Sequence, residues 1–120
     1  MRILHTADLH LGRQFSGISL DDDHAAVLDQ ILATLKQERA DVLLIAGDVF
    51  DRAAPPATAV RQFNGFLGRV ARETEAALVM IAGNHDSADR IGAMAIMPDS
   101  RRALIAGPVD GAADPLILVD

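Results

Sequence analysis

The sequence predicts an α/β fold built on a largely parallel sheet flanked by helices, and three observations lead to this prediction. Apolar runs at residues 2–7, 42–46 and 77–82 each have the length of a typical strand. Amphipathic segments at 22–38 and 57–73 lie between these runs and carry apolar residues at helical spacing. Strands that alternate with helices form parallel sheets with right-handed crossovers. Ligands bind beyond the carboxyl ends of such strands, so polar residues that follow the runs are expected to lie together.

The boundaries of the predicted elements carry the expected residues. An acidic run at 21–23 precedes the first helix, where negative charge is favourable. A pair of prolines precedes the second helix. The run 42–46 is apolar throughout, as is typical of a parallel strand covered on both faces. Three further elements are expected towards the end of the chain: a short helix at 88–97 and strands at 103–106 and 116–119.

The composition limits the class of protein. At 120 residues the chain is at most one domain, and with 50% hydrophobic residues it can build a core. With four Phe and no Trp or Tyr, that core must be mainly aliphatic. The absence of Cys excludes disulfides and thiolate metal sites. A net charge of −6 argues against broad nonspecific nucleic-acid binding. No signal peptide or membrane span is recognisable, so a soluble cytoplasmic protein is expected.

Three polar clusters directly follow the three apolar runs. Carboxylate, imidazole and amide groups gathered at one edge of a sheet can hold a hard or borderline divalent ion. Two such ions roughly 3.5–4 Å apart can activate water and hold the oxygens of a phosphoryl group. Each cluster by itself is also typical of an ordinary polar turn. The clusters are Asp8-Leu9-His10, Gly47-Asp48-Val49-Phe50-Asp51 and Gly83-Asn84-His85-Asp86.

The first two clusters offer the candidate metal ligands. Residues two apart in extended backbone point to the same side, so Asp8 and His10 are expected to bind one metal ion together. The two oxygens of Asp48 can bridge two ions. We expect Asp51 either to support a ligand or to cap the following turn. His5, inside the first strand, is expected to be a hydrogen-bonded core residue rather than a ligand.

The third cluster offers a further ligand and candidate catalytic groups. Asn84 presents an amide oxygen to a metal ion, whereas His85, its neighbour, is expected to face the substrate. An imidazole there can stabilise a phosphate oxygen or protonate the leaving group. Asp86 is placed to orient His85.

Two further sets of residues have open interpretations. Three arginines that closely follow the clusters are either candidate phosphate contacts or solvated loop residues. The set is Arg13, Arg52 and Arg90. A surplus of apolar residues is expected to divide between the core and a dimer interface. The surplus comprises Phe63, Phe66, Leu67, Val70, Ile91, Met94, Ile96 and Met97.

The order Asp-x-His, Gly-Asp-x-x-Asp, Gly-Asn-His-Asp resembles the calcineurin-like metallophosphoesterases, and the flanking residues resemble a DNA-repair nuclease branch of that family. The resemblance implies the N-terminal half of an α/β sandwich that holds two metal ions, most simply Mn²⁺. It further implies hydrolysis of DNA phosphodiesters as an exonuclease and endonuclease, a coiled-coil ATPase partner, and a homodimer. Asp8 and His10 would bind the first metal ion, Asp48 would bridge both and Asn84 would bind the second. The scissile phosphate would be contacted by His85, supported by Asp86.

One departure from this family concerns histidines. Members supply a single histidine and then a Gly-His-x-His pair further along, whereas none occurs in the 35 residues that follow His85. An N-terminal fragment, inactive alone and without the capping region and ATPase-binding helices, is therefore expected; a degenerate relative is the alternative. Two other functions stay open: a phosphoesterase acting on nucleotides or phosphoproteins, and a non-catalytic folding or dimerisation module.

Overall fold

The computed structural model describes residues 1–52, 54–81 and 103–106. None of the helices in these ranges is both long and apolar enough to cross a membrane. The expected helix at 88–97 and strand at 116–119 lie outside the described residues. In chain order the elements are β1 (Ile3–Ala7), β2 (Gln14–Phe15), β3 (Ile18–Ser19), α1 (Asp21–Glu38), β4 (Val42–Ala46), α2 (Ala57–Glu73), β5 (Ala77–Ile81) and β6 (Ala103–Ala106).

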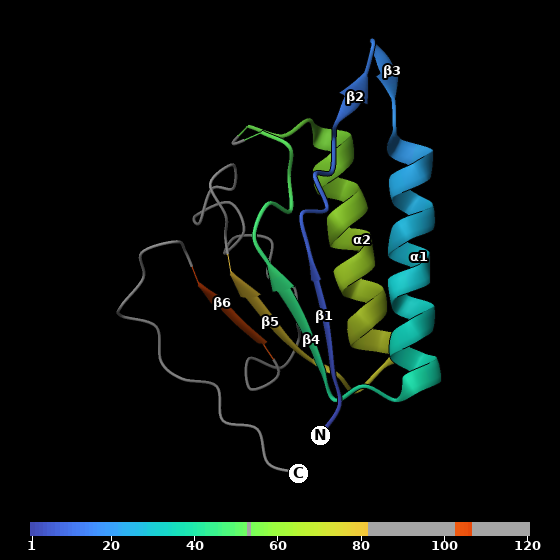
Figure 1. The fold of residues 1–120 in the computed structure, drawn as a ribbon, viewed down its shortest axis with the longest axis vertical. Coiled ribbons are helices and arrows are strands. Elements are labelled where there is room, and N and C mark those ends of the chain that lie inside the picture. The colour runs from blue at the N-terminus through green and yellow to red at the C-terminus, as the bar shows by residue number, and fades with distance from the viewer. Residues whose placement is uncertain (53, 82–102, 107–120) are drawn as a thin grey trace.

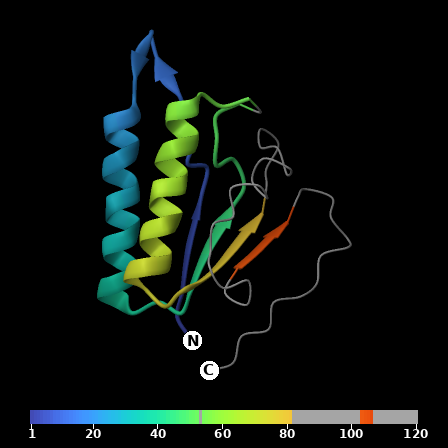
Figure 2. The same cartoon turned by 180° about the vertical axis from the view of Figure 1, so that it is seen from behind.

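The main sheet has four strands in the order β1-β4-β5-β6, and every neighbouring pair is parallel. The predicted parallel α/β architecture is therefore confirmed. Because the strand order advances in one direction, right-handed crossovers place α1 and α2 on the same face. Figures 1 and 2 show the two helices side by side over that face, with all four strands running towards the same edge.

The core lies between the sheet and the two helices. The side chains of Leu43, Ile45, Leu78 and Met80 point to this side and are fully buried. Helix α2 contributes an apolar stripe because its buried positions recur at three- and four-residue spacing. That stripe consists of Ala59, Phe63, Phe66, Leu67 and Val70. The four α2 members of the larger apolar set, Phe63, Phe66, Leu67 and Val70, are buried in the core of the chain itself. The other four members lie outside the described residues, so the expected interface stays a prediction.

The opposite face of the sheet is only partly covered within the described residues. Side chains alternate across a strand, so Leu44 and Val79 point away from the helices and are half-buried. Ile3 and Ile81 on this face are 59% and 45% exposed. The same alternation places His5 at an exposed position, so the predicted core histidine is wrong. The described elements therefore cover one face of the sheet rather than both.

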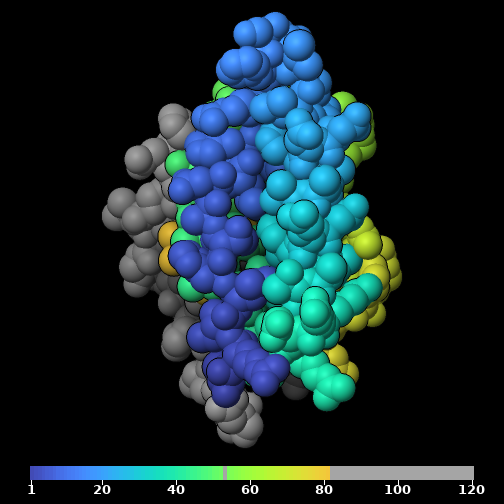
Figure 3. Space-filling view, turned by 45° about the vertical axis from the view of Figure 1, so that its right-hand side comes forward, coloured from blue at the N-terminus to red at the C-terminus, as the bar shows by residue number. Residues whose placement is uncertain are grey.

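The sequence did not predict the hairpin formed by β2 and β3. Its two-residue turn, Ser16-Gly17, has positive φ at both positions, the conformation that matches the twist of a tight hairpin. Strands of two residues are too short to show alternation. Phe15 and Ile18, which pair in the register, are 71% and 66% exposed. The hairpin stands beyond the start of α1 at one end of the molecule (Figures 1 and 3).

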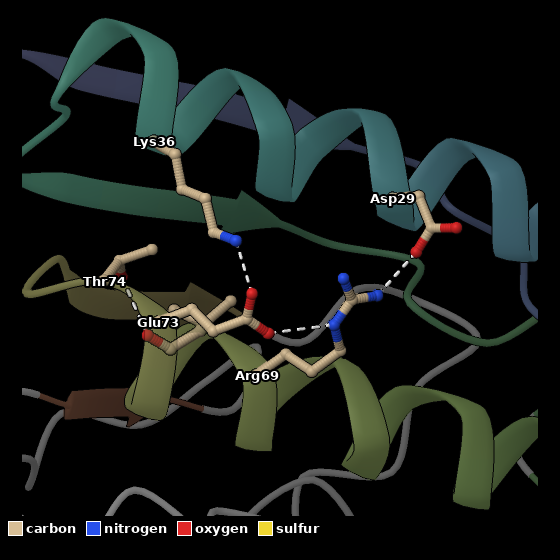
Figure 4. Close-up of polar contacts among 6 residues, drawn as sticks. Asp29, Lys36, Arg69, Glu73 and Thr74 are labelled. Carbon is tan, nitrogen blue, oxygen red and sulfur yellow. Dashed lines mark hydrogen bonds and ion pairs between the residues drawn. The ribbon is translucent and has the colours of Figure 1, made fainter.

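A chain of ion pairs joins the outer surfaces of α1 and α2 (Figure 4). Arg69 on α2 contacts Asp29 on α1 at 2.6 Å and Glu73 at 3.1 Å, and Glu73 also pairs with Lys36. The hydrogen bonds from Lys36 and then from Arg69 hold the pKa of Glu73 below its ordinary value. The reciprocal contacts with Asp29 and Glu73 raise the pKa of Arg69. The side chains are solvent-accessible, so the network adds little free energy to the packing of the two helices, which rests mainly on their buried apolar residues.

Replacing Phe63 by Ala should remove the ring at the centre of the core. Its side chain is fully buried and contacts Phe50 edge-to-face, with ring centroids 5.7 Å apart. We expect the free energy of unfolding to fall by about 3–5 kcal/mol, measured by urea denaturation. Val27→Ala, at a position that is 43% exposed, is the matched control and should change stability far less.

Replacing Glu73 by Gln should reduce stability in a pH-dependent way. A carboxylate whose pKa is lowered in the folded state stabilises the protein above its unfolded pKa, and this contribution disappears as the group is protonated. The melting temperature of Glu73→Gln should therefore lie below that of the wild type at pH 7, and the difference should close below about pH 4. A difference that is constant from pH 7 to pH 3 would contradict this assignment.

Candidate metal centre

The hydrogen bonding between β1 and β4 continues past the ends of both strands. The backbone N–H of Asp8 donates to the carbonyl of Gly47 at 3.2 Å, and that of His10 donates to the carbonyl of Asp48 at 2.9 Å. Leu11 then donates to Val49 at 2.8 Å. The two loops that carry the first and second polar clusters are thus held side by side at the carboxyl edge of the sheet, as the parallel topology requires.

Three of the predicted ligands meet in this position. The Nε2 atom of His10 lies 4.0 Å from Oδ1 of Asp8 and 4.0 Å from Oδ2 of Asp48. One ligand atom from each residue lies within 4.8 Å of the other two. The side chains of His10 and Asp48 are 20% and 22% exposed, whereas that of Asp8 is 69% exposed. The group is therefore open to solvent on the side of Asp8.

The separations suit a single divalent ion. Bonds of about 2.0–2.2 Å from nitrogen or oxygen place two ligands of one ion at most about 4.4 Å apart. The 4.0 Å separations between His10 and each carboxylate fall within this limit. One imidazole and two carboxylates also form a donor set that borderline and hard divalent ions accept. The residues present therefore fit a metal ion.

The backbone at these ligands is unusual. Asp8, His10 and Asp48 have φ values of 54°, 49° and 49°, in the left-handed region that is uncommon for residues other than glycine and that Asp, Asn and His enter more often than the rest. We expected Asp8 and His10 to point to the same side because the backbone would be extended. The two side chains do converge, but the backbone is not extended at either residue. The two side chains converge because the chain turns sharply at both residues. Strained backbone of this kind concentrates at functional sites.

Buried residues beneath the ligands support this conformation. Leu11, which follows His10, and Val49 and Phe50, which follow Asp48, are at most 1% exposed. Gly12 lies against the start of α2, where a Cβ atom would come within 3.0 Å of the Pro56 ring. With a φ of 88°, Gly12 also takes a conformation that favours glycine.

Asp51 lies behind the ligands and contacts two of the residues that the sequence singled out. Its Oδ1 atom lies 3.3 Å from Nδ1 of His10 and accepts a hydrogen bond from Nε of Arg13 at 3.0 Å. Arg13, one of the three candidate phosphate contacts, thus pairs with a carboxylate of this chain through its Nε atom. Arg52 is exposed, and Arg90 lies outside the described residues.

The third cluster, Asn84, His85 and Asp86, lies outside the described residues. The end of the strand that leads to it is described. The carbonyl of Ile81, the last residue of β5, accepts a hydrogen bond of 2.7 Å from the backbone N–H of Gly47. The chain therefore leaves β5 directly beside the loop that carries Asp48, three residues before Asn84.

The sequence is similar to those of known proteins. Residues 1–111 match the family described as calcineurin-like phosphoesterase. The D subunit of the nuclease SbcCD from Bacillus subtilis is 44% identical over 93 residues, which is 78% of this chain and 24% of the relative. Its counterpart of the same name from Escherichia coli K12 is 45% identical over 87 residues, 72% of this chain and 22% of the relative. The protein of the same name from Staphylococcus saprophyticus is 42% identical over 91 residues, which is 76% of this chain and 24% of the relative. The chain thus spans about a quarter of the length of the curated relatives it matches.

Replacing Asp48 by Ala should disrupt metal binding more than it disrupts folding. The change removes one of three candidate ligands but none of the backbone N–H and C=O groups that pair the two loops. We expect the dissociation constant for Mn²⁺, measured by calorimetry, to rise by more than the roughly 10- to 100-fold typical of losing an outer contact. Asp23→Ala, an exposed position on α1, removes the same charge and should bind as the wild type does. An unchanged dissociation constant for Asp48→Ala would contradict the assignment.

Proposed function

Because this chain belongs to the calcineurin-like phosphoesterase family, we propose that it forms the start of a metal-dependent nuclease that hydrolyses the phosphodiester bonds of DNA. The observation that carries the proposal is the convergence of Asp8, His10 and Asp48 on one point at the carboxyl edge of the sheet. The relatives, which are named as parts of a nuclease, narrow the proposal from phosphoesterases in general to nucleases.

The roles of the residues follow from their donor atoms and positions. Asp8 and His10 would hold a first ion, and Asp48, which is carried by the neighbouring loop, would use its second oxygen for another. A pair of bound ions would supply an activated water molecule and neutralise charge on the phosphoryl group. Asn84, which follows the strand next to Asp48, would contribute an amide oxygen to the second ion.

His85 would act on the substrate rather than on a metal ion. An imidazole at this position would stabilise a non-bridging oxygen of the phosphate or give a proton to the leaving oxygen. Asp86 would orient that imidazole. These two roles rest on the resemblance of Gly83-Asn84-His85-Asp86 to the family motif.

We further propose two Mn²⁺ ions as the metals. The carboxylate and amide oxygens favour hard ions such as Mn²⁺, and the imidazole tolerates a borderline one. The histidines that complete both metal shells would come from sequence beyond residue 120. The curated relatives, of which this chain spans 24% or less, are long enough to supply them.

The wider biological role is proposed from the relatives. Their name makes them one component of a nuclease called SbcCD, so we propose a coiled-coil ATPase of the SbcC type as partner and homodimerisation of the nuclease component. DNA repair in the cytoplasm would be the setting. Arg52 and Arg90 would contact DNA phosphates near the metal centre, and Arg13 would do so with the guanidinium nitrogens that do not face Asp51.

The proposal is tested by assaying the full-length protein on linear double-stranded DNA and on a small phosphodiester. We expect cleavage of DNA that requires Mn²⁺, stops on chelation and is lost in Asp48→Ala. A chain restricted to residues 1–120 should show little or no turnover, because it holds only part of the proposed ligand set.

Three results would count against the proposal. Hydrolysis of nucleotides or phosphoproteins without cleavage of DNA would identify a different phosphoesterase. DNA cleavage that is unaffected by chelation would exclude the metal mechanism. Strong Mn²⁺-dependent nuclease activity from residues 1–120 alone would show that no further ligands are needed.

A further inference from the structure

We infer that Asp51 is a positioning residue for His10: it fixes the imidazole ring so that Nε2 faces Asp8 and Asp48. The inference rests on the proposed metal centre, and it assigns a role to a carboxylate that lies outside the ligand set. Asp51 is separated from Asp48 by two buried residues, Val49 and Phe50.

The two nitrogens of His10 face different carboxylates. Nδ1 lies 3.3 Å from Asp51, whereas Nε2 lies 4.0 Å from both Asp8 and Asp48. A carboxylate beside Nδ1 favours the tautomer that carries its proton there, which leaves the lone pair of Nε2 for a metal ion. Nδ1 of the ring thus faces the supporting carboxylate of Asp51, and Nε2 faces the position proposed for the metal ion.

Asp51 is itself held in place from two directions. Its backbone N–H donates to the carbonyl of Leu11 at 3.0 Å, next to the bridge between Leu11 and Phe50. Its side chain accepts the hydrogen bond from Nε of Arg13. Because Leu11 and Phe50 are buried, the position of Asp51 is fixed by the core and not by the exposed loop.

Arg13 also adjusts the charge of the centre. Asp8, Asp48 and Asp51 bring three carboxylates around one imidazole. The guanidinium of Arg13 offsets the charge of Asp51 at 3.0 Å, so that carboxylate supports His10 without adding a third uncompensated charge. The side chain of Asp51 is 26% exposed and that of Arg13 is 52% exposed, so the arginine covers the carboxylate from the solvent side. The described contacts therefore favour support of a ligand over the turn-capping role.

The test compares metal binding with folding in the full-length protein. Asp51→Leu keeps the branched shape and the four heavy atoms of the side chain but has no acceptor, whereas Asp51→Asn keeps an oxygen that can accept from both His10 and Arg13. Asp51→Ala serves as a second variant without an acceptor if the leucine is poorly tolerated. Asp22→Leu, at an exposed position on α1, is the control for loss of one negative charge. Calorimetry with Mn²⁺ gives the dissociation constant, and thermal unfolding of the metal-free protein gives stability.

We expect the dissociation constant to rise about 10- to 100-fold in Asp51→Leu and Asp51→Ala, as is typical when an outer contact of a histidine ligand is lost. Asp51→Asn should restore most of the affinity, and Asp22→Leu should bind as the wild type does. The metal-free melting temperatures of Asp51→Leu and Asp51→Asn should be similar, since the acceptor acts on the ring and not on the fold. Rescue by Asn is the result that a merely structural role would not produce.

Other outcomes overturn the inference. Unchanged Mn²⁺ affinity in Asp51→Leu and Asp51→Ala, with or without a fall in kcat, would show that Asp51 acts elsewhere than on His10. If Asp51→Asn bound Mn²⁺ as weakly as Asp51→Leu does, the charge of Asp51 and not its hydrogen-bond acceptor would determine the affinity. Failure of the proposed function is distinguishable, because a wild type that binds Mn²⁺ but does not cleave DNA refutes the nuclease and leaves the Asp51 comparison intact.

Discussion

The parallel pairing of β1 with β4 is the constraint on which the rest of the structure depends. Its register aligns Ala7 with Ala46, so that the next residues of the two chains, Asp8 and Gly47, leave the sheet together. The hydrogen bonds then continue from His10 to Asp48, which brings an imidazole within 4.0 Å of a carboxylate that lies 38 positions further along the chain. A shift of one residue in this register would turn the side chains of β1 to the opposite face and separate the two loops.

The candidate ligands occupy strained backbone, and neighbouring core residues offset the cost. Positive φ at non-glycine residues costs of order 1–3 kcal/mol each when the conformation is sparsely populated. At this edge the loops that carry three such residues, Asp8, His10 and Asp48, also carry Leu11, Val49 and Phe50, which are almost completely buried. Burying a Leu or Phe side chain contributes about 1.5–3 kcal/mol, which is of the same size as the backbone cost at each strained residue. In these two loops the buried apolar residues therefore stabilise the backbone conformation that brings the polar side chains together.

The ion pair of Lys36 with Glu73 and the candidate metal centre lie at opposite edges of the sheet. The helices run back along the sheet, so the carboxyl ends of α1 and α2 lie at the edge opposite the ligands (Figure 1). The pairing of Lys36 with Glu73 belongs to that far edge (Figure 4). Changes to the pair of Lys36 with Glu73 therefore act far from the candidate metal ligands, whereas Asp48 is one of these candidates and Asp51 contacts another, His10.

The sequence by itself determined the elements whose patterns are long and regular. The helix at 57–73 and the strands at 42–46 and 103–106 were predicted with the bounds that the structure has, because apolar periodicity and flanking prolines are local signals. It also determined which residue types meet, since parallel strands must end at one edge. Only the tertiary structure decided how they meet. The positive φ of Asp8 and His10, the exposure of His5, the hairpin around Gly17 and the contact of Asp51 with His10 all depend on packing between segments distant in the sequence. No local pattern of residues encodes such contacts.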